Sequence, residues 1–157
     1  MTKTNAMRML DTAHITYKTF EYEWSEDDLS GVKVARQVGL PEEQVFKTLV
    51  AKGDKTGFVV FCIPVAEELD MKKAAKASGN KSVELIHVKE ILGVTGYIRG
   101  GCSPVGMKKK FPTFIDETCI LFDEIAVSAG VRGCQLFVNT EALVAFTEAT
   151  ECSLVME

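Results

Sequence analysis

The sequence has none of the short motifs that mark the common enzyme classes. It contains no GxxxxGK[ST] phosphate loop, no GxSxG nucleophile turn and no HExxH zinc motif. It has only two histidines, and none of its five cysteines is spaced as C-x-x-C, so neither a metal site nor a cofactor is expected. Either the protein is not an enzyme, or its chemistry needs few side chains of its own.

Long apolar runs are also missing. No run approaches the roughly 18 residues that cross a bilayer, and the N-terminal stretch MTKTNAMRMLD lacks the apolar core of a secretory signal. These absences predict a cytoplasmic protein without a membrane partner. The cysteines are scattered through apolar stretches, and we expect reduced thiols packed as small hydrophobic side chains.

What is present fits one globular domain. The 157 residues are 46% hydrophobic and 25% charged, which predicts a single domain over residues 1–157. The apolar and turn patterns predict helices at 4–13, 29–40, 41–46, 71–79, 87–94 and 140–149, and strands at 14–24, 47–52, 58–65, 81–86, 113–118, 120–124, 125–130 and 134–139. Short helices and strands mix without regular βαβ alternation, which favours an α+β fold with a strongly curved mixed sheet.

Helix ends carry recognisable caps. Asp70 is expected to cap the helix at 71–79, and Gly79 to end it. Gly93 is expected to close the following helix, and Asn139 to cap the last one.

The charge is unevenly distributed. The chain carries a net −4, yet residues 71–110 contain nine Lys or Arg and only two acidic side chains. Such a segment can attract a polyanion while the acidic remainder repels non-specific contacts. The alternative is a solvated helix face together with a solubilising triple lysine.

Three features could carry chemistry. Lys47 has apolar neighbours and opens a strand, so it is either a solvated side chain or a cation at the mouth of a pocket. Tyr22 ends a strand, where it either packs at the rim or lines a site. The stretch GGCSPVG at 100–106 is an ordinary turn, the setting of a reactive Cys102, or a backbone cradle for a ligand.

Four blocks together carry a family resemblance. In order they are VFKTLV, IPVAEELDMKKAAKASGNKSVELI, TGYIRGGCSPVGMKKKFPTFID and VSAGVRG. The chain resembles the YbaK/EbsC-type Cys-tRNA(Pro) deacylases, which are freestanding relatives of the editing domain of prolyl-tRNA synthetases. The resemblance implies a compact α+β fold with a barrel-like sheet surrounded by short helices, and hydrolytic removal of cysteine from mischarged tRNA(Pro).

The resemblance also implies roles for single residues. Lys47 matches the family's characteristic lysine, and the backbone at Gly100 and Gly101 would stabilise the oxyanion, so these three are the expected catalytic positions. The expected substrate-binding residues are Tyr22, Thr48, Ser103, Pro104, Ser128, Arg132 and Gln135. Some relatives have an aspartate where this chain has Gln135, so an acid-dependent role is not expected there.

The resemblance gives the basic segment a partner. Lys72, Lys73, Lys108, Lys109 and Lys110 are expected to contact tRNA phosphates. A prolyl-tRNA synthetase is a candidate partner, because recognition of the tRNA body by so small a protein is expected to be weak. Two rival functions stay open: an editor for alanine or another small amino acid, and a non-catalytic module that binds tRNA or a synthetase.

Overall fold

The computed structural model describes residues 2–157, and two β-sheets organise this part of the chain. The elements follow one another as α1 (Asn5–Thr12), β1 (Tyr17–Glu21), α2 (Gly31–Val38), η1 (Glu42–Gln44), β2 (Phe46–Gly53), β3 (Gly57–Pro64), α3 (Met71–Ser78), β4 (Val83–Leu85), α4 (Val88–Thr95), β5 (Thr113–Asp116), η2 (Glu117–Leu121), β6 (Glu124–Ser128), β7 (Cys134–Asn139), α5 (Thr140–Thr147) and β8 (Thr150–Cys152). The predicted α+β class is confirmed. Every helix here is too short to cross a lipid bilayer.

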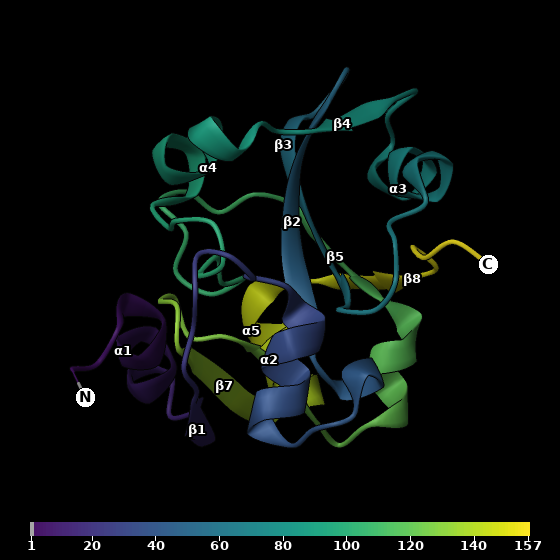
Figure 1. The fold of residues 1–157 in the computed structure, drawn as a ribbon. Helices are drawn as coiled ribbons and strands as arrows, with labels where there is room; N and C mark the ends of the chain where they lie inside the picture. The colour runs from purple at the N-terminus through teal and green to yellow at the C-terminus, as the bar shows by residue number, and fades with distance from the viewer. Residues whose placement is uncertain (1) are drawn as a thin grey trace.

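The larger sheet has the strand order β4-β2-β3-β5-β8 and mixes antiparallel with parallel pairs. Its centre is the long hairpin of β2 and β3, and α3 and α4 lie on opposite sides of that hairpin (Figure 1). Asn80 supports the turn between the two strands, because its Oδ1 accepts hydrogen bonds from the backbone N–H groups of Lys55 and Thr56 at 2.9 and 3.1 Å.

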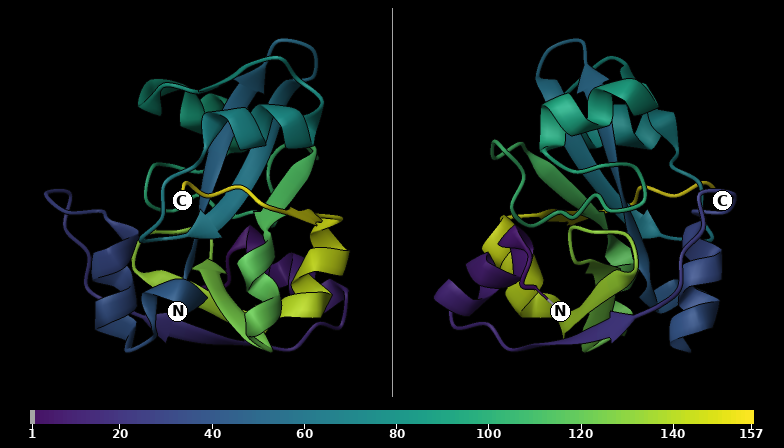
Figure 2. Two further views of the ribbon diagram at one scale, coloured as in Figure 1. Left: turned by 90° about the vertical axis from the view of Figure 1, so that its right-hand side faces the viewer. Right: turned by 60° about the vertical axis from the view of Figure 1, so that its left-hand side comes forward.

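The smaller sheet is an antiparallel layer with the order β1-β7-β6. It lies at the end of the molecule opposite the turn between β2 and β3, with α5 beside β7 (Figure 2). The two sheets meet at an isolated parallel bridge between Val45 and Ala126, just before β2 begins. We predicted one curved, barrel-like sheet. In the described residues the strands instead form two sheets joined at one bridge, and no closed barrel forms.

The core fills the space between these layers. The largest group of buried side chains joins α1, both sheets and α5, and includes Leu10, Val60, Ile125, Leu136 and Leu143. A second group lies under α3, where Phe61 stacks on Phe114 with ring centroids 5.6 Å apart. Burial of these side chains is the main stabilising term of the fold.

Most local predictions are confirmed, including the Asp70 and Asn139 caps and the left-handed Gly79. Two are wrong. The segment 120–124 is not a strand, because Asp116 caps a 3₁₀ helix there, and Ile120 and Leu121 are exposed. Helix α4 continues past Gly93 and ends at the left-handed Gly96, since a glycine inside a helix is only mildly unfavourable.

Candidate functional site

A cavity of about 380 Å³ opens where the two sheets meet. Residues from the start of β2, the start of α2, the loop after α4 and the adjoining ends of β6 and β7 line it. Six of the predicted site residues lie on its wall: Tyr22, Lys47, Thr48, Gly100, Ser128 and Gln135. They come from four distant parts of the sequence and are brought together by the fold alone.

Lys47 supplies a partly buried cation to this cavity. It lies near the start of β2, opposite Ile63 of β3, and is partly buried. Burial lowers its pKa from the ordinary value of 10.5, because an ammonium group loses hydration there, while Glu68 and Glu67 act in the opposite direction. Such a partly desolvated cation suits an anionic or strongly polar ligand.

Gly100 supplies an unused backbone donor. Its φ of +86° lies in the left-handed region, and a Cβ at this position would come within 3.3 Å of Leu29 and 3.4 Å of Arg132. The Gly100 N–H has no hydrogen-bond partner in residues 2–157. The Gly101 N–H differs, because it donates to the carbonyl of Ile98 at 2.9 Å and is committed to the turn. Of the two predicted oxyanion donors, the structure leaves Gly100 available.

Gln135 places an unpartnered acceptor in the cavity wall. It pairs with Ser128 across β6 and β7, and it is only 6% exposed. Its Oε1 has no hydrogen-bond partner in the described residues. The side chain of Ser128, by contrast, has a hydrogen-bond partner, since its Oγ accepts from the Gly130 N–H at 3.1 Å. A buried carbonyl oxygen without a donor is costly unless a ligand satisfies it.

Cys102 also lines the cavity, and its chemistry can be judged from its surroundings. Burial raises the pKa of its thiol to about 11, so the nucleophilic thiolate is scarce at neutral pH. All five cysteines are free thiols, and burial likewise raises the pKa of Cys62 to about 12 and that of Cys119 to about 11.

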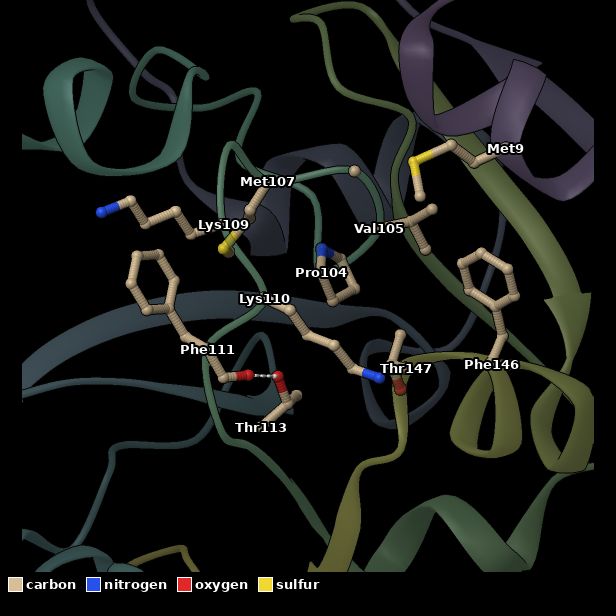
Figure 3. A pocket seen from close by; sticks show the side chains of 11 residues that line it. Met9, Pro104, Val105, Met107, Lys109, Lys110, Phe111, Thr113, Phe146 and Thr147 are labelled. Atoms are coloured by element: carbon tan, nitrogen blue, oxygen red, sulfur yellow. Dashed lines mark hydrogen bonds between the residues drawn. The ribbon is translucent and has the colours of Figure 1, made fainter. Parts of the chain in front are cut away.

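Besides Gly101, three of the predicted catalytic and substrate-binding residues are absent from this cavity wall. Ser103 is fully buried, and its Oγ accepts a hydrogen bond from the Val105 N–H at 3.2 Å. Pro104 lines a second cavity of about 320 Å³, together with Phe111 and Phe146 (Figure 3). Arg132 touches the glycine loop from outside, where its Nε donates to the Arg99 carbonyl.

The predicted tRNA-binding lysines do not form one surface. Lys73 belongs to α3, where its Nζ donates to the Val155 carbonyl at 2.9 Å and so holds the C-terminal segment. Lys108 reaches the Gly93 carbonyl beside α4, and Lys110 forms an ion pair with Glu148 at 2.7 Å. Lys72 and Lys109 are exposed. Lys72 and Lys73 belong to α3, whereas Lys108 contacts α4, and these two helices lie on opposite sides of the central hairpin (Figure 1).

Sequence reasoning missed the apolar walls of the cavity. Leu29, Val34, Val65 and Ile91 line it, together with the exposed Arg99. The helical spacing of Val34 and the apolar face of α4 are signals that could have suggested them. Among residues 2–157, no group of three or more His, Cys, Asp or Glu side chains is placed to hold a metal ion.

Comparison with known proteins identifies the architecture around this cavity. Residues 29–146 match the aminoacyl-tRNA editing domain. The chain belongs to this family. A protein of Enterococcus faecalis, provisionally named Cys-tRNA(Pro)/Cys-tRNA(Cys) deacylase EbsC, is 53% identical over 145 residues, covering 92% of this chain and 88% of that protein.

More distant relatives match this chain in sequence or in fold. A proline–tRNA ligase of Thermosipho africanus is 32% identical over 92 residues, which are 59% of this chain and 16% of the ligase. A crystal structure described as a provisional trans-editing enzyme for prolyl tRNA synthetase has a TM-score of 0.84 and 25% identity, with all of both chains covered. The hypothetical protein APE2540 superimposes with a TM-score of 0.88 at 19% identity, covering 98% of this chain and 100% of its own, and shows the same fold.

Proposed function

We propose that this editing domain is a deacylase that removes cysteine from mischarged tRNA(Pro). The observation that carries the proposal is the cavity itself, which combines the partly buried Lys47 ammonium with the unpartnered Gly100 N–H and offers no reactive thiolate. The name of the Enterococcus faecalis relative, at 53% identity, supports the same substrate class.

The substrate supplies the nucleophile in this mechanism. The thiol of the misattached cysteine has a pKa near 8.5 and is partly ionised at neutral pH. Its sulfur attacks the ester carbonyl carbon of the same aminoacyl group, a carbon–sulfur bond forms, and the carbon–oxygen bond to the ribose breaks. The ribose oxygen takes up a proton, so that free tRNA and a cysteine thiolactone are released. Tethering of the thiol to the ester supplies several kcal/mol through effective molarity.

The protein then needs only to position the aminoacyl group and to stabilise the negative charge that develops on its carbonyl oxygen. We assign the Gly100 N–H as donor to the oxygen that becomes negative during attack, because Gly100 lines the cavity and this N–H has no partner within residues 2–157. Lys47 anchors the ligand as a cation, and the Gln135 Oε1 accepts a hydrogen bond from a ligand donor such as the α-ammonium group. Tyr22, Thr48 and Ser128 complete the wall. This division of labour explains why the sequence has no nucleophile motif.

The deciding experiment is a substrate panel. Purified protein is incubated with Cys-, Ala- and Ser-charged tRNA(Pro) and with Cys-tRNA(Cys), and the release of the amino acid is measured. We expect the two Cys-tRNAs to be cleaved and the Ala and Ser esters to persist, because only cysteine carries its own nucleophile. Cleavage of Ala-tRNA(Pro) would contradict the mechanism, and binding without cleavage of any ester would indicate a non-catalytic module.

A synthetase partner belongs to the same proposal. The match to the proline–tRNA ligase is confined to 16% of that protein, so the rest of the ligase is absent from this chain. We propose that prolyl-tRNA synthetase supplies recognition of the tRNA body. Adding the synthetase should then raise the deacylation rate at tRNA concentrations below saturation, and an unchanged rate would contradict the partnership.

A further inference from the structure

We infer that Arg132 is a positioning residue that holds and polarises the peptide bond between Arg99 and Gly100, and so strengthens Gly100 as an oxyanion donor. The inference rests on the proposed function, because it assigns the oxyanion to Gly100. Arg132 is absent from the cavity wall, and its effect on the ligand must pass through the glycine loop.

Arg132 is fixed by contacts on three sides. Its Nε donates to the Arg99 carbonyl at 2.7 Å, and its guanidinium carbon lies 5.2 Å from the centre of the Trp24 ring. Its Nη1 lies 3.6 Å from Glu26, whose side chain is 80% exposed, while the Arg132 side chain is only 16% exposed. A short charge-assisted hydrogen bond and a cation–π contact thus hold the guanidinium against the loop.

The hydrogen bond acts on the peptide group that carries the free donor. The Arg99 carbonyl and the Gly100 N–H belong to the same peptide unit, and a cationic donor on its oxygen draws electron density away from its nitrogen. The N–H then becomes a stronger donor, as in any chain of polarised hydrogen bonds. The positive charge also lies close, since a Cβ on Gly100 would be 3.4 Å from the Arg132 Nε. Both effects favour a negative oxygen at the Gly100 N–H.

Neighbouring backbone contacts keep this arrangement rigid. The Tyr22 N–H donates to the Gly133 carbonyl at 2.9 Å, which joins the end of β1 to the loop that carries Arg132. Gly133 has a φ of +90°, and a Cβ there would lie 2.9 Å from Trp24, so the ring packs directly on the backbone. At Gly101, a Cβ would be 3.1 Å from the Val131 carbonyl carbon. Three loops therefore meet around one guanidinium.

A direct contact between Arg132 and a tRNA phosphate is the competing role. It would require the guanidinium to exchange its carbonyl and its aromatic partner for solvent-side phosphate oxygens. The small exposed fraction of the side chain favours the positioning role. The two roles predict different kinetics, because a positioning residue alters kcat and a phosphate contact alters KM and the salt dependence.

The test compares Arg132→Lys with Arg8→Lys, using Cys-tRNA(Pro) as the substrate. Arg8 also donates to a backbone carbonyl, that of Lys3 at 2.8 Å, but it lies on α1 outside the cavity. We expect Arg132→Lys to lower kcat by about 10- to 100-fold with KM changed less than about twofold, somewhat below the roughly 100- to 1,000-fold loss typical for removal of an oxyanion donor. We expect Arg8→Lys to leave both constants unchanged.

Trp24 provides an independent readout, because it is the only tryptophan in the chain. Loss of the guanidinium from its ring should change the intrinsic fluorescence of Arg132→Lys and not that of Arg8→Lys. If Arg132→Lys does not fold, Trp24→Leu decides the matter: it removes the stacking partner at a ring that is 47% exposed and should lower kcat in the same direction.

The possible results distinguish the positioning role from a phosphate contact and from a failure of the proposed function. Unchanged kcat in a folded Arg132→Lys or Trp24→Leu variant overturns the inference, as does a raised KM with a weaker salt dependence, which would indicate a phosphate contact. An inactive wild-type protein would instead contradict the proposed function itself.

Discussion

Lys47 is the side chain whose replacement tests the site most directly. We expect Lys47→Met to reduce Cys-tRNA(Pro) deacylation at least about 100-fold, since it removes the cavity's partly buried cation. Lys52→Met is the matched control, because Lys52 lies on the same strand but is exposed. Initial rates with matched far-UV circular dichroism measure both variants. Near wild-type turnover by Lys47→Met would contradict the assignment of Lys47 to the active site.

The same residue predicts a dependence of stability on pH. The folded-state pKa of Lys47 lies below the ordinary 10.5, so between these two values the unfolded chain binds more protons than the folded one. The contribution of Lys47 to the free energy of unfolding therefore rises with pH through this window. Below it, the buried charge is a fixed cost, which Lys47→Met removes.

Denaturant titrations from pH 7 to 11 measure this linkage. We expect Lys47→Met to be at least as stable as the wild type at pH 7, and its advantage to shrink as the pH approaches 10.5. A gap between the two proteins that stays constant over this range would contradict the lowered pKa.

Cys102 gives the opposite prediction. Its thiol lines the cavity, but burial raises its pKa to about 11, and the substrate brings its own sulfur. We expect Cys102→Ala to keep kcat within about threefold of the wild type, with a small loss of stability from the lost packing. Mass spectrometry of the protein during turnover should show no acyl adduct. A folded but inactive Cys102→Ala protein would make Cys102 the nucleophile.

At the scale of elements, Asp116 adds side-chain hydrogen bonds at the place where β5 pairs with β8. It is only 1% exposed, its Oδ2 accepts from the backbone N–H of Thr118 at the start of η2, and its Oδ1 accepts from the Leu154 N–H at 2.9 Å. One carboxylate thus ties β5 and η2 to the C-terminal segment. Its burial is tolerated because both oxygens are satisfied.

Removing this carboxylate should destabilise the fold without touching the cavity. We expect Asp116→Ala to lower the free energy of unfolding by about 1–3 kcal/mol, because it leaves the buried Leu154 N–H without a partner. Urea denaturation measures the change, and kcat for Cys-tRNA(Pro) should stay unchanged below the transition. Asp123→Ala, at an exposed position, serves as the control. Equal stability of the two variants would contradict the role.

At the scale of the whole molecule, we expect the charge distribution to govern tRNA binding. The chain is acidic overall, yet Lys108, Lys109 and Lys110 follow the glycine loop that borders the cavity. Lys72 and Lys73 lie on α3, on the other side of the central hairpin, and Lys73 already holds the C-terminal segment (Figure 1). A tRNA whose aminoacyl end occupies the cavity is therefore closer to the first group.

Binding as a function of salt separates the two groups. We expect tRNA affinity to fall with rising salt, and the Lys108→Ala/Lys109→Ala/Lys110→Ala variant to reduce the slope of log K against log salt by about 1–3. Lys72→Ala should change the slope by less than about 0.5, well below the value for one phosphate contact. Fluorescence anisotropy between 50 and 300 mM salt measures these slopes. Equal effects at both positions would show that binding does not follow this geometry.

Local chemistry alone determined much of this protein. The caps at Asp70 and Asn139 and the left-handed Gly79 could be predicted, because each depends on a few adjacent residues. The family could be predicted as well, since four ordered blocks carry it. The strand predicted at 120–124 is wrong, because Ile120 and Leu121 belong to the 3₁₀ helix η2 and are exposed.

Tertiary structure alone decided how the candidate site is assembled. Ser103, Pro104 and Arg132 lie within a few residues of cavity residues in the sequence, but each contacts something else, because a loop presents different sides to different neighbours. The pairing of Ser128 with Gln135, the unused N–H of Gly100 and the desolvation of Lys47 all depend on segments far apart in the chain. Burial and hydrogen bonding between segments far apart in the chain are properties of the packed molecule, and no local pattern encodes them.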